Sequence, residues 1–169
     1  MSAKAAAHAA GGISHSNPDI APVSEAGFLA GTILLTQDGE LPVEFLSPGD
    51  RIISRDRGLV PLRHITRAPQ TVRAIRFAAG SLGDTRPDCD LVLPAGQPVL
   101  IRDWRAQALF GTRQALVRAD ALVDGEFVCD LGPRVLHLFQ LHFDVNHVLY
   151  AGGLEVAGQC LSVPGRLAA

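Results

Sequence analysis

The sequence predicts a single all-β domain, and three observations lead to that prediction. Short apolar runs recur along the chain, and turn-forming residues separate them. The 169 residues include 17 Gly and 11 Pro, which favours many tight turns. With 47% hydrophobic and 19% charged residues, the chain has the composition of a globular protein that buries a real core.

The first predicted elements form a compact β-meander. Two apolar runs, at residues 32–36 and 41–45, flank Asp38-Gly39. This dipeptide favours a hairpin because both residues tolerate positive φ. The turn Ser47-Pro48-Gly49-Asp50 then leads into a strand over residues 51–54, and one more turn leads into a strand over residues 59–66.

The second part of the chain continues the pattern of short strands and turns. We expect strands over residues 71–77, 91–93, 99–102, 115–117, 127–130, 135–143, 147–150 and 154–156. Gly132-Pro133 predicts a turn between two of these strands, and residues 118–122 predict one helical turn. Residues 104–111 are ambiguous; we expect Trp104 and Phe110 to cover the core, with a docking patch as the alternative.

The two ends of the chain differ from the middle. Residues 1–26 are small and polar and lack periodicity, so we predict a disordered leader, followed by a domain over 27–160 and a tail over 161–169. The leader has no apolar signal-peptide core, and no run reaches the length of a membrane helix. These features slightly favour the cytoplasm without fixing the compartment, and non-classical secretion stays open.

Charge and cysteine content limit the function further. A formal net charge of −2 gives no electrostatic reason to expect nucleic acid or an anionic membrane as partner. The three cysteines, Cys89, Cys129 and Cys160, form no CxxC pair and are interpreted as idle thiols. The sequence therefore predicts no metal, no cofactor and no membrane insertion, and it leaves an unknown protein partner open.

The chain also echoes itself. Residues 30–35, AGTILL, resemble residues 95–101, AGQPVLI, with one residue inserted. Residues 46–52, LSPGDRI, resemble residues 122–128, LVDGEFV. In the second pair an apolar residue, a turn glycine and an acid precede a strand, which would suit two related β halves around one core.

Several segments follow one another in a characteristic order. A GT pair precedes the first strand, DG and SPGD turns follow, and later segments read LVLPAGQPVLI, WRAQALFGTRQALV, LVDGEFV and FDVNHVLYAGGL. This order and spacing resemble the bacterial branch of the Hint (hedgehog/intein) domains over residues 27–160. The resemblance implies an all-β horseshoe or barrel of two pseudo-symmetric halves.

The resemblance also implies a chemistry. Active Hint domains carry out an acyl shift at their own N-terminal junction, where a Cys or Ser attacks the preceding carbonyl. A Thr and a His on a central strand polarise that carbonyl and protonate the leaving amine. In inteins, a late His and a terminal Asn then release the C-terminal side. An amide is a poor electrophile, so the reaction needs an activated nucleophile, oxyanion support and a placed acid.

When the catalytic positions of the family are compared with this sequence one by one, most of them carry a different residue. The nucleophile position falls on Gly27, which has no side chain, and the central-strand His falls near Gln97, which cannot shuttle a proton at neutral pH. The late His corresponds to His147. The terminal His-Asn pair falls on about Ala157-Gly158.

Four further residues are weaker candidates. Thr32 and Ser24 carry the hydroxyls nearest to the missing nucleophile, but Thr32 lies in a predicted strand and Ser24 in the leader. Gln159-Cys160 faintly resembles an intein C-terminal junction, with one residue inserted. For His147 we expect a structural role, with its ring hydrogen-bonded to a nearby backbone group.

The sequence thus predicts a Hint-type domain that does not splice and serves as a structural or protein-binding module. Two alternatives stay open: a self-cleaving autoprocessing domain, which would be an enzyme acting on its own chain, and a small-ligand-binding β domain. For the catalytic alternative the candidates are His147, Gln97, Thr32, Gln159 and Cys160, with Gly27 at the nucleophile position.

Overall fold

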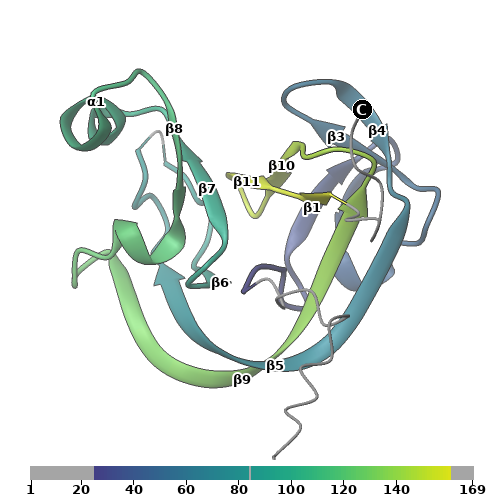
Figure 1. Cartoon of the computed structure of the whole chain (residues 1–169), viewed down its shortest axis with the longest axis horizontal. Helices are drawn as coiled ribbons and strands as arrows, with labels where there is room; N and C mark the ends of the chain where they lie inside the picture. The colour runs from purple at the N-terminus through teal and green to yellow at the C-terminus, as the bar shows by residue number, and fades with distance from the viewer. Residues whose placement is uncertain (1–24, 84, 161–169) are drawn as a thin grey trace, which may run out of the picture.

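The computed structural model describes residues 25–83 and 85–160. The chain folds into a horseshoe whose two arms rise from a curved base (Figure 1). One sheet has eight strands, in the order β2-β1-β3-β10-β11-β7-β8 with β4 paired to β3, and the other has four, in the order β12-β9-β5-β6. Both sheets are open, so the predicted all-β horseshoe is confirmed and a closed barrel is not formed. Residues 1–24 of the predicted leader and the predicted tail lie outside the described residues.

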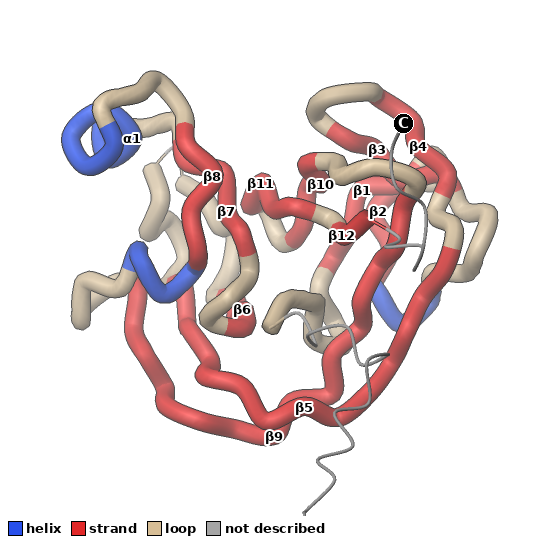
Figure 2. The backbone as a smooth tube through the Cα atoms, in the orientation of Figure 1, coloured by secondary structure: helices blue, strands red, loops and turns tan. Residues whose placement is uncertain are grey.

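Most elements are short strands (Figure 2). The strands are β1 (Ile33–Thr36), β2 (Gly39–Pro42), β3 (Arg51–Ser54), β4 (Gly58–Pro61), β5 (His64–Phe77), β6 (Leu91–Pro94), β7 (Pro98–Ile101), β8 (Ala115–Arg118), β9 (Val128–Phe143), β10 (Val148–Ala151), β11 (Leu154–Ala157) and β12 (Gln159–Cys160). The helices are α1 (Trp104–Phe110) and the 3₁₀ turns η1 (Val43–Phe45) and η2 (Ala119–Leu122).

The base of the horseshoe consists of β5 and β9, which pair antiparallel from one arm to the other (Figure 1). The prediction of two strands separated by a turn at Gly132-Pro133 was wrong, because β9 continues through both residues. The pairing register shifts between Arg73 and Ile75, where β9 carries an extra residue. A bulge of this kind bends a strand pair without ending it, and Gly132, at φ +78°, supplies the backbone conformation that the bend needs.

The two arms repeat one arrangement. In the first, the β1–β2 hairpin runs directly into η1, and in the second the β7–β8 hairpin runs into η2. The same backbone contact closes each unit: Val43 N donates to Thr32 O, and Ala119 N donates to Gln97 O, both at 2.9 Å. The echo in the sequence therefore corresponds to two pseudo-symmetric halves in the structure, and Thr32 and Gln97 occupy equivalent positions in them.

Helix α1 is the largest departure from this symmetry. The β1–β2 connection is a tight turn, whereas the β7–β8 connection contains α1. Asp103 caps the helix at its N-terminus, and Gly111 ends it in the left-handed conformation. Trp104 is 70% exposed and Phe110 is 44% exposed, so the expectation that they cover the core was wrong. The reason is that α1 buries only Ala106.

The hydrophobic core fills the space between the two sheets. Its largest fully buried apolar side chains are Phe28, Phe77, Phe143, Leu34, Ile52, Leu62, Ile75, Leu93, Leu138, Leu141 and Leu149. They come from both arms and from the base, so the halves share one core. Within the described residues, no helix combines the length and the apolar character that a membrane span requires.

Candidate functional site

The N-terminal junction pairs with β9 through an isolated antiparallel bridge between Phe28 and Phe139. Phe28 N donates to Phe139 O at 2.9 Å, and Phe139 N donates to Phe28 O at 2.8 Å. The Phe28 side chain is 2% exposed and Ala26 is 3% exposed. The segment is thus bound to the base of the horseshoe by both its backbone and its side chains.

Two glutamine side chains hold the peptide group between Ala26 and Gly27. The Gly27 N–H donates to Gln97 Oε1 at 2.9 Å, and Gln140 Nε2 donates to the Ala26 carbonyl oxygen at 3.1 Å. The nitrogen and the oxygen of this buried amide therefore each have a partner. A buried amide without such partners would be costly.

Gly27 has a conformation and surroundings that disfavour any side chain. Its φ is +147°, a region that L residues rarely adopt. A Cβ atom at this position would lie 3.1 Å from Phe139 O and 3.2 Å from Leu138 Cβ. Local packing therefore leaves little room for a cysteine or serine in the present backbone position.

Gln97 also reaches the C-terminal part of the domain. Its Nε2 donates to Ala157 O at 2.9 Å and to Pro98 O at 3.2 Å. The side chain is only 1% exposed. The amide orientation is fixed by this network, because its oxygen faces the Gly27 N–H while its nitrogen faces two carbonyls. Gln97 thus joins the N-terminal junction to the end of β11.

His147 lies only ten residues before Ala157 in the sequence, but its ring forms its hydrogen bond with a different segment. Its Nδ1 is 2.8 Å from Asp56 Oδ2, and its carbonyl accepts from Gly158 N at 2.8 Å. We expected a backbone partner for the ring, and the structure gives a carboxylate instead. Burial acts to raise the pKa of Asp56, but hydrogen bonds from His147 and the Val148 N–H outweigh it and bring that pKa below its usual value.

The weaker candidates do not converge on the junction. Thr32 is 5% exposed, and its backbone closes the first-half unit described above. Gln159 and Cys160 pair through their main chains with His142 and Phe143 as the parallel strand β12, and their side chains lie outside the described part of the structure. Ser24 also lies outside it.

A series of side-chain hydrogen bonds also connects the base of the horseshoe to the junction. Thr66 Oγ1 donates to Gln140 Oε1 at 3.1 Å and lies 3.1 Å from His142 Nε2. A hydroxyl has one proton to give, so His142 Nε2 is the donor in the second bond. All three bonds from His142 to the Ala26 carbonyl then point the same way. Burial lowers the pKa of His142 below its usual 6.5, and the His64 ring, 5.8 Å away, adds to this effect.

Sequence reasoning missed Gln140 and Asp56. Gln140 alternates with buried residues along β9, which is the pattern of any half-buried strand position. Asp56 lies in the turn before the predicted strand over residues 59–66, and its partner His147 lies 91 residues later. Neither residue carries a local signal, because both roles depend on contacts between distant segments.

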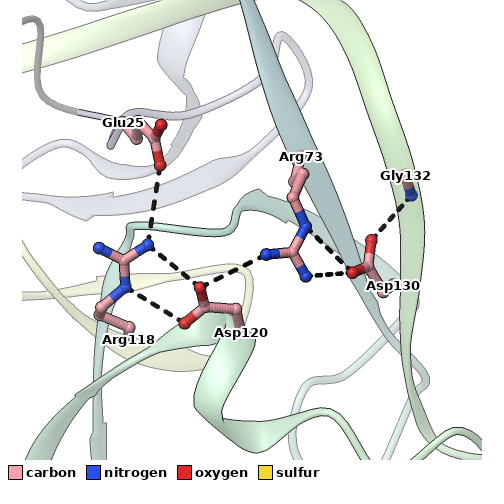
Figure 3. Close-up of polar contacts among 6 residues, drawn as sticks. All are labelled: Glu25, Arg73, Arg118, Asp120, Asp130 and Gly132. Atoms are coloured by element: carbon pink, nitrogen blue, oxygen red, sulfur yellow. Dashed lines mark hydrogen bonds and ion pairs between the residues drawn. The ribbon is translucent and has the colours of Figure 1, made fainter.

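An ionic network holds the residue that precedes the junction (Figure 3). Glu25 lies 3.7 Å from Arg118, which makes two bonds to Asp120 at 3.1 and 3.2 Å. Asp120 lies 3.9 Å from Arg73, which also binds Asp130 at the bend of β9. Beside Glu25, Gly96 has no room for a Cβ, which would lie 2.8 Å from Glu25 Cβ. The network links the entering chain to both η2 and the base.

Comparison with protein families matches residues 26–158 to the Hint domain. The chain belongs to this family. The matched range begins one residue before Gly27 and ends at Gly158, so it contains both the junction and the segment that Gln97 holds. The resemblance in the sequence is therefore confirmed at the level of the family.

Solved structures agree with the Hint fold. A bacterial intein-like domain from Clostridium thermocellum is 15% identical, with a TM-score of 0.53, and the match covers 79% of this chain and 97% of that one. A DnaB intein from Synechocystis sp. PCC 6803 is 11% identical, with a TM-score of 0.52, and the match covers 79% and 99%. At these identities the likeness establishes the fold alone. No curated protein matches the chain.

In this Hint domain, two side-chain amides bind the Ala26–Gly27 peptide group at the junction. The Oε1 of Gln97 accepts a hydrogen bond from the Gly27 N–H, whereas a leaving amine would require a group that donates a proton to that nitrogen. Gln140 does donate to the carbonyl, as an oxyanion contact would. The geometry of carbonyl polarisation is present, whereas an attacking atom and an acid are absent from the described contacts of Gly27.

A cavity of about 300 Å³ lies apart from the junction. Its lining includes Ile33, Leu35, Arg86, Cys89 and Tyr150. None of the residues that hold the Ala26–Gly27 peptide lines it. The contacts at the junction therefore give no support to the small-ligand alternative.

Proposed function

We propose that this Hint domain keeps its N-terminal junction intact and acts as a structural or protein-binding module. The observation that carries this proposal is the bonding of the Ala26–Gly27 peptide: its N–H donates to the side-chain Oε1 of Gln97, and Gly27 has no side chain. The same contacts that would orient a scissile amide here hold a stable one.

The contacts that the His147 ring makes also support the proposal. An imidazole serving an acyl shift would need a hydroxyl or thiol and a peptide carbonyl within hydrogen-bond reach. The described ring contacts of His147 are with Asp56 and with the edge of Phe143, at 5.7 Å between centroids. These contacts tie the turn after β3 to the start of β10, which is a structural task.

The hydrogen bonds of Gln97 explain how the domain could serve a structural role. They connect residue 27, where the domain begins, to residue 157, near its end. These hydrogen bonds tie the two ends of the domain together, so local unfolding at one end would also have to break contacts with the other. Binding of a protein partner is the second half of the proposal and concerns the outer surface.

Intact-mass spectrometry tests the first half. The purified chain is incubated with a thiol and, separately, with hydroxylamine, which would trap a thioester or ester. We expect one species of 17.9 kDa in both samples and in the untreated control. A product cut at Ala26–Gly27, or near Gln159, would support the autoprocessing alternative. The variants Ser24→Ala, Thr32→Ala and Cys160→Ala would then identify the nucleophile.

A further inference from the structure

A cavity on the outer face of the larger sheet combines apolar and charged side chains. It is the cavity of about 300 Å³ that lies apart from the junction, and its lining brings together Leu35, Glu40, Arg86, Asp88 and Tyr150. In β1 and β10, buried residues alternate with half-buried ones, and the half-buried Leu35 and Tyr150 face the cavity. Small molecules bind in concave sites of this kind, where an apolar lining carries a few polar groups.

The register of the sheet builds one wall of the cavity. Leu35 of β1 pairs with Glu40 of β2, and the register between β1 and β10 places Tyr150 on the other side of Leu35. Tyr150 in turn pairs with Glu155 of β11. Directly opposed residues on neighbouring strands share one face of a sheet, so these four side chains form a row. The row places an acid at each end of an apolar patch.

The segment before β6 builds the opposite wall over the β10–β11 turn. Arg86 Nη1 donates to the carbonyl oxygen of Gly153 at 3.2 Å. Asp88 packs against the same glycine, where a Cβ atom would lie 3.0 Å from Asp88 Oδ2. Gly153 also has a φ of +84°, so only glycine suits this position. The turn thus fixes both Arg86 and Asp88 beside the cavity.

The charged side chains around the cavity do not neutralise one another. Among the residues that the structure describes, no ion pair joins Arg86 to Glu40 or Asp88, and neither carboxylate has another cationic partner. The bond that Arg86 makes is to an uncharged backbone carbonyl. Glu155, at the far end of the row, differs because Arg55 and Arg102 both pair with it. Two carboxylates and one guanidinium therefore remain for a ligand to pair with.

Charges of both signs beside one apolar wall match a small zwitterion. An ammonium group suits the carboxylates of Glu40 and Asp88, and a carboxylate suits the fixed N–H donors of the Arg86 guanidinium. An apolar group between these two charges can lie against Leu35 and the ring of Tyr150. A purely anionic or purely cationic molecule would instead meet at least one like charge in the cavity.

We infer that this cavity binds free amino acids that carry an apolar side chain. Glu40 and Asp88 hold the α-ammonium group, Arg86 holds the α-carboxylate, and the side chain of the ligand packs on Leu35 and Tyr150. None of the residues that hold the Ala26–Gly27 peptide lines the cavity, so the inference is independent of whether the junction is cleaved.

Leucine and two analogues test the inference. The full chain, labelled with ¹⁵N, is titrated to about 10 mM, because a ligand of this size binds weakly. The analogues are 3-methylbutylamine, which lacks the carboxylate of leucine, and 4-methylpentanoate, which lacks its ammonium group. We expect leucine to shift the amide signals of Tyr150, Gly152 and Gly153 saturably. Each analogue should bind at least about tenfold more weakly, because it loses one charge-assisted contact.

Matched variants assign each charge to a residue. Glu40→Gln should weaken leucine and 3-methylbutylamine but not 4-methylpentanoate, because only the first two carry an ammonium group. Arg86→Gln should weaken leucine and 4-methylpentanoate but not 3-methylbutylamine. The controls are Glu126→Gln and Arg113→Gln, which remove exposed charges outside the cavity and should bind like the parent. Circular dichroism checks that each variant folds.

Cys89 provides an independent readout of binding. Its thiol is free and exposed, and the residue lines the cavity. Bound leucine should therefore slow the alkylation of Cys89 by N-ethylmaleimide. Cys129 is also free but does not line the cavity, so its rate should not change. Mass spectrometry of the digested protein measures the two rates in one sample.

Three outcomes would overturn the inference. Leucine could cause no saturable shift in the β10–β11 turn and leave the alkylation of Cys89 unchanged. The parent could bind 3-methylbutylamine as tightly as leucine, which would assign the cavity to cations. Glu126→Gln could also weaken leucine as much as Glu40→Gln, which would trace the effect to the net charge of the chain.

Discussion

Replacing Gln97 by leucine tests whether its amide closes the domain. Leucine is an apolar side chain of similar size, and the site is only 1% exposed, so the change removes polar contacts more than volume. Two groups lose their partners: the Gly27 N–H, bonded at 2.9 Å, and the Ala157 carbonyl, also bonded at 2.9 Å. Each buried orphan costs about 1–3 kcal/mol.

From these contacts we expect the free energy of unfolding to fall by about 3 kcal/mol. The weaker bond to Pro98, at 3.2 Å, adds little, and the more favourable burial of leucine offsets part of the loss. The assay is urea unfolding followed by far-ultraviolet circular dichroism, with the m-value checked for constancy. Gln107→Leu, on the exposed face of α1, is the matched control and should change the free energy by less than about 0.5 kcal/mol.

A loss below about 0.5 kcal/mol for Gln97→Leu would refute the reasoning, because an unmade hydrogen bond in a buried site cannot be neutral. It would mean that water enters and replaces the amide. An equal loss in Gln97→Leu and Gln107→Leu would instead trace the effect to added leucine on unfolded chains.

Two other perturbations probe the same site. Gly27→Ala should cost about 1–3 kcal/mol more than Gly39→Ala, because both glycines have positive φ but only Gly27 lacks room for a Cβ; equal costs in urea unfolding would remove the crowding argument. The pKa of His142 is lowered in the folded state, so the unfolded chain binds the proton more readily and stability is lost as the pH falls from 6.5 through the folded pKa. His142→Gln should flatten this part of the pH profile of unfolding, whereas the exposed His137→Gln should leave it unchanged.

Much of the fold could be predicted from local patterns. Asp38-Gly39 and the Ser47–Asp50 turn specify their hairpins through backbone preferences that act within four residues, and the structure contains both turns. The echo between Ala30 and Ala95 predicted two halves. Prediction failed at Gly132-Pro133, where local turn propensity was overridden by pairing with β5 across the bend.

The candidate site was predictable only in part. The sequence identified Gly27, Gln97 and His147 through the order of motifs, since order survives when individual residues change. It gave no sign that Gln140 holds the Ala26 carbonyl or that Asp56 binds His147. These pairs are 114 and 91 residues apart, and no local propensity encodes such distances.

By itself, the sequence determined the β character of the domain, its duplicated plan and the absence of a side chain at residue 27, because each of these depends on residue identity or short-range spacing. The tertiary structure alone decided which way the Gln97 amide faces, which carboxylates pair with Arg102 and Arg118, and how exposed Trp104 is. Those properties arise when distant segments are packed together, since burial, hydrogen-bond partners and local charge are defined by neighbours in space.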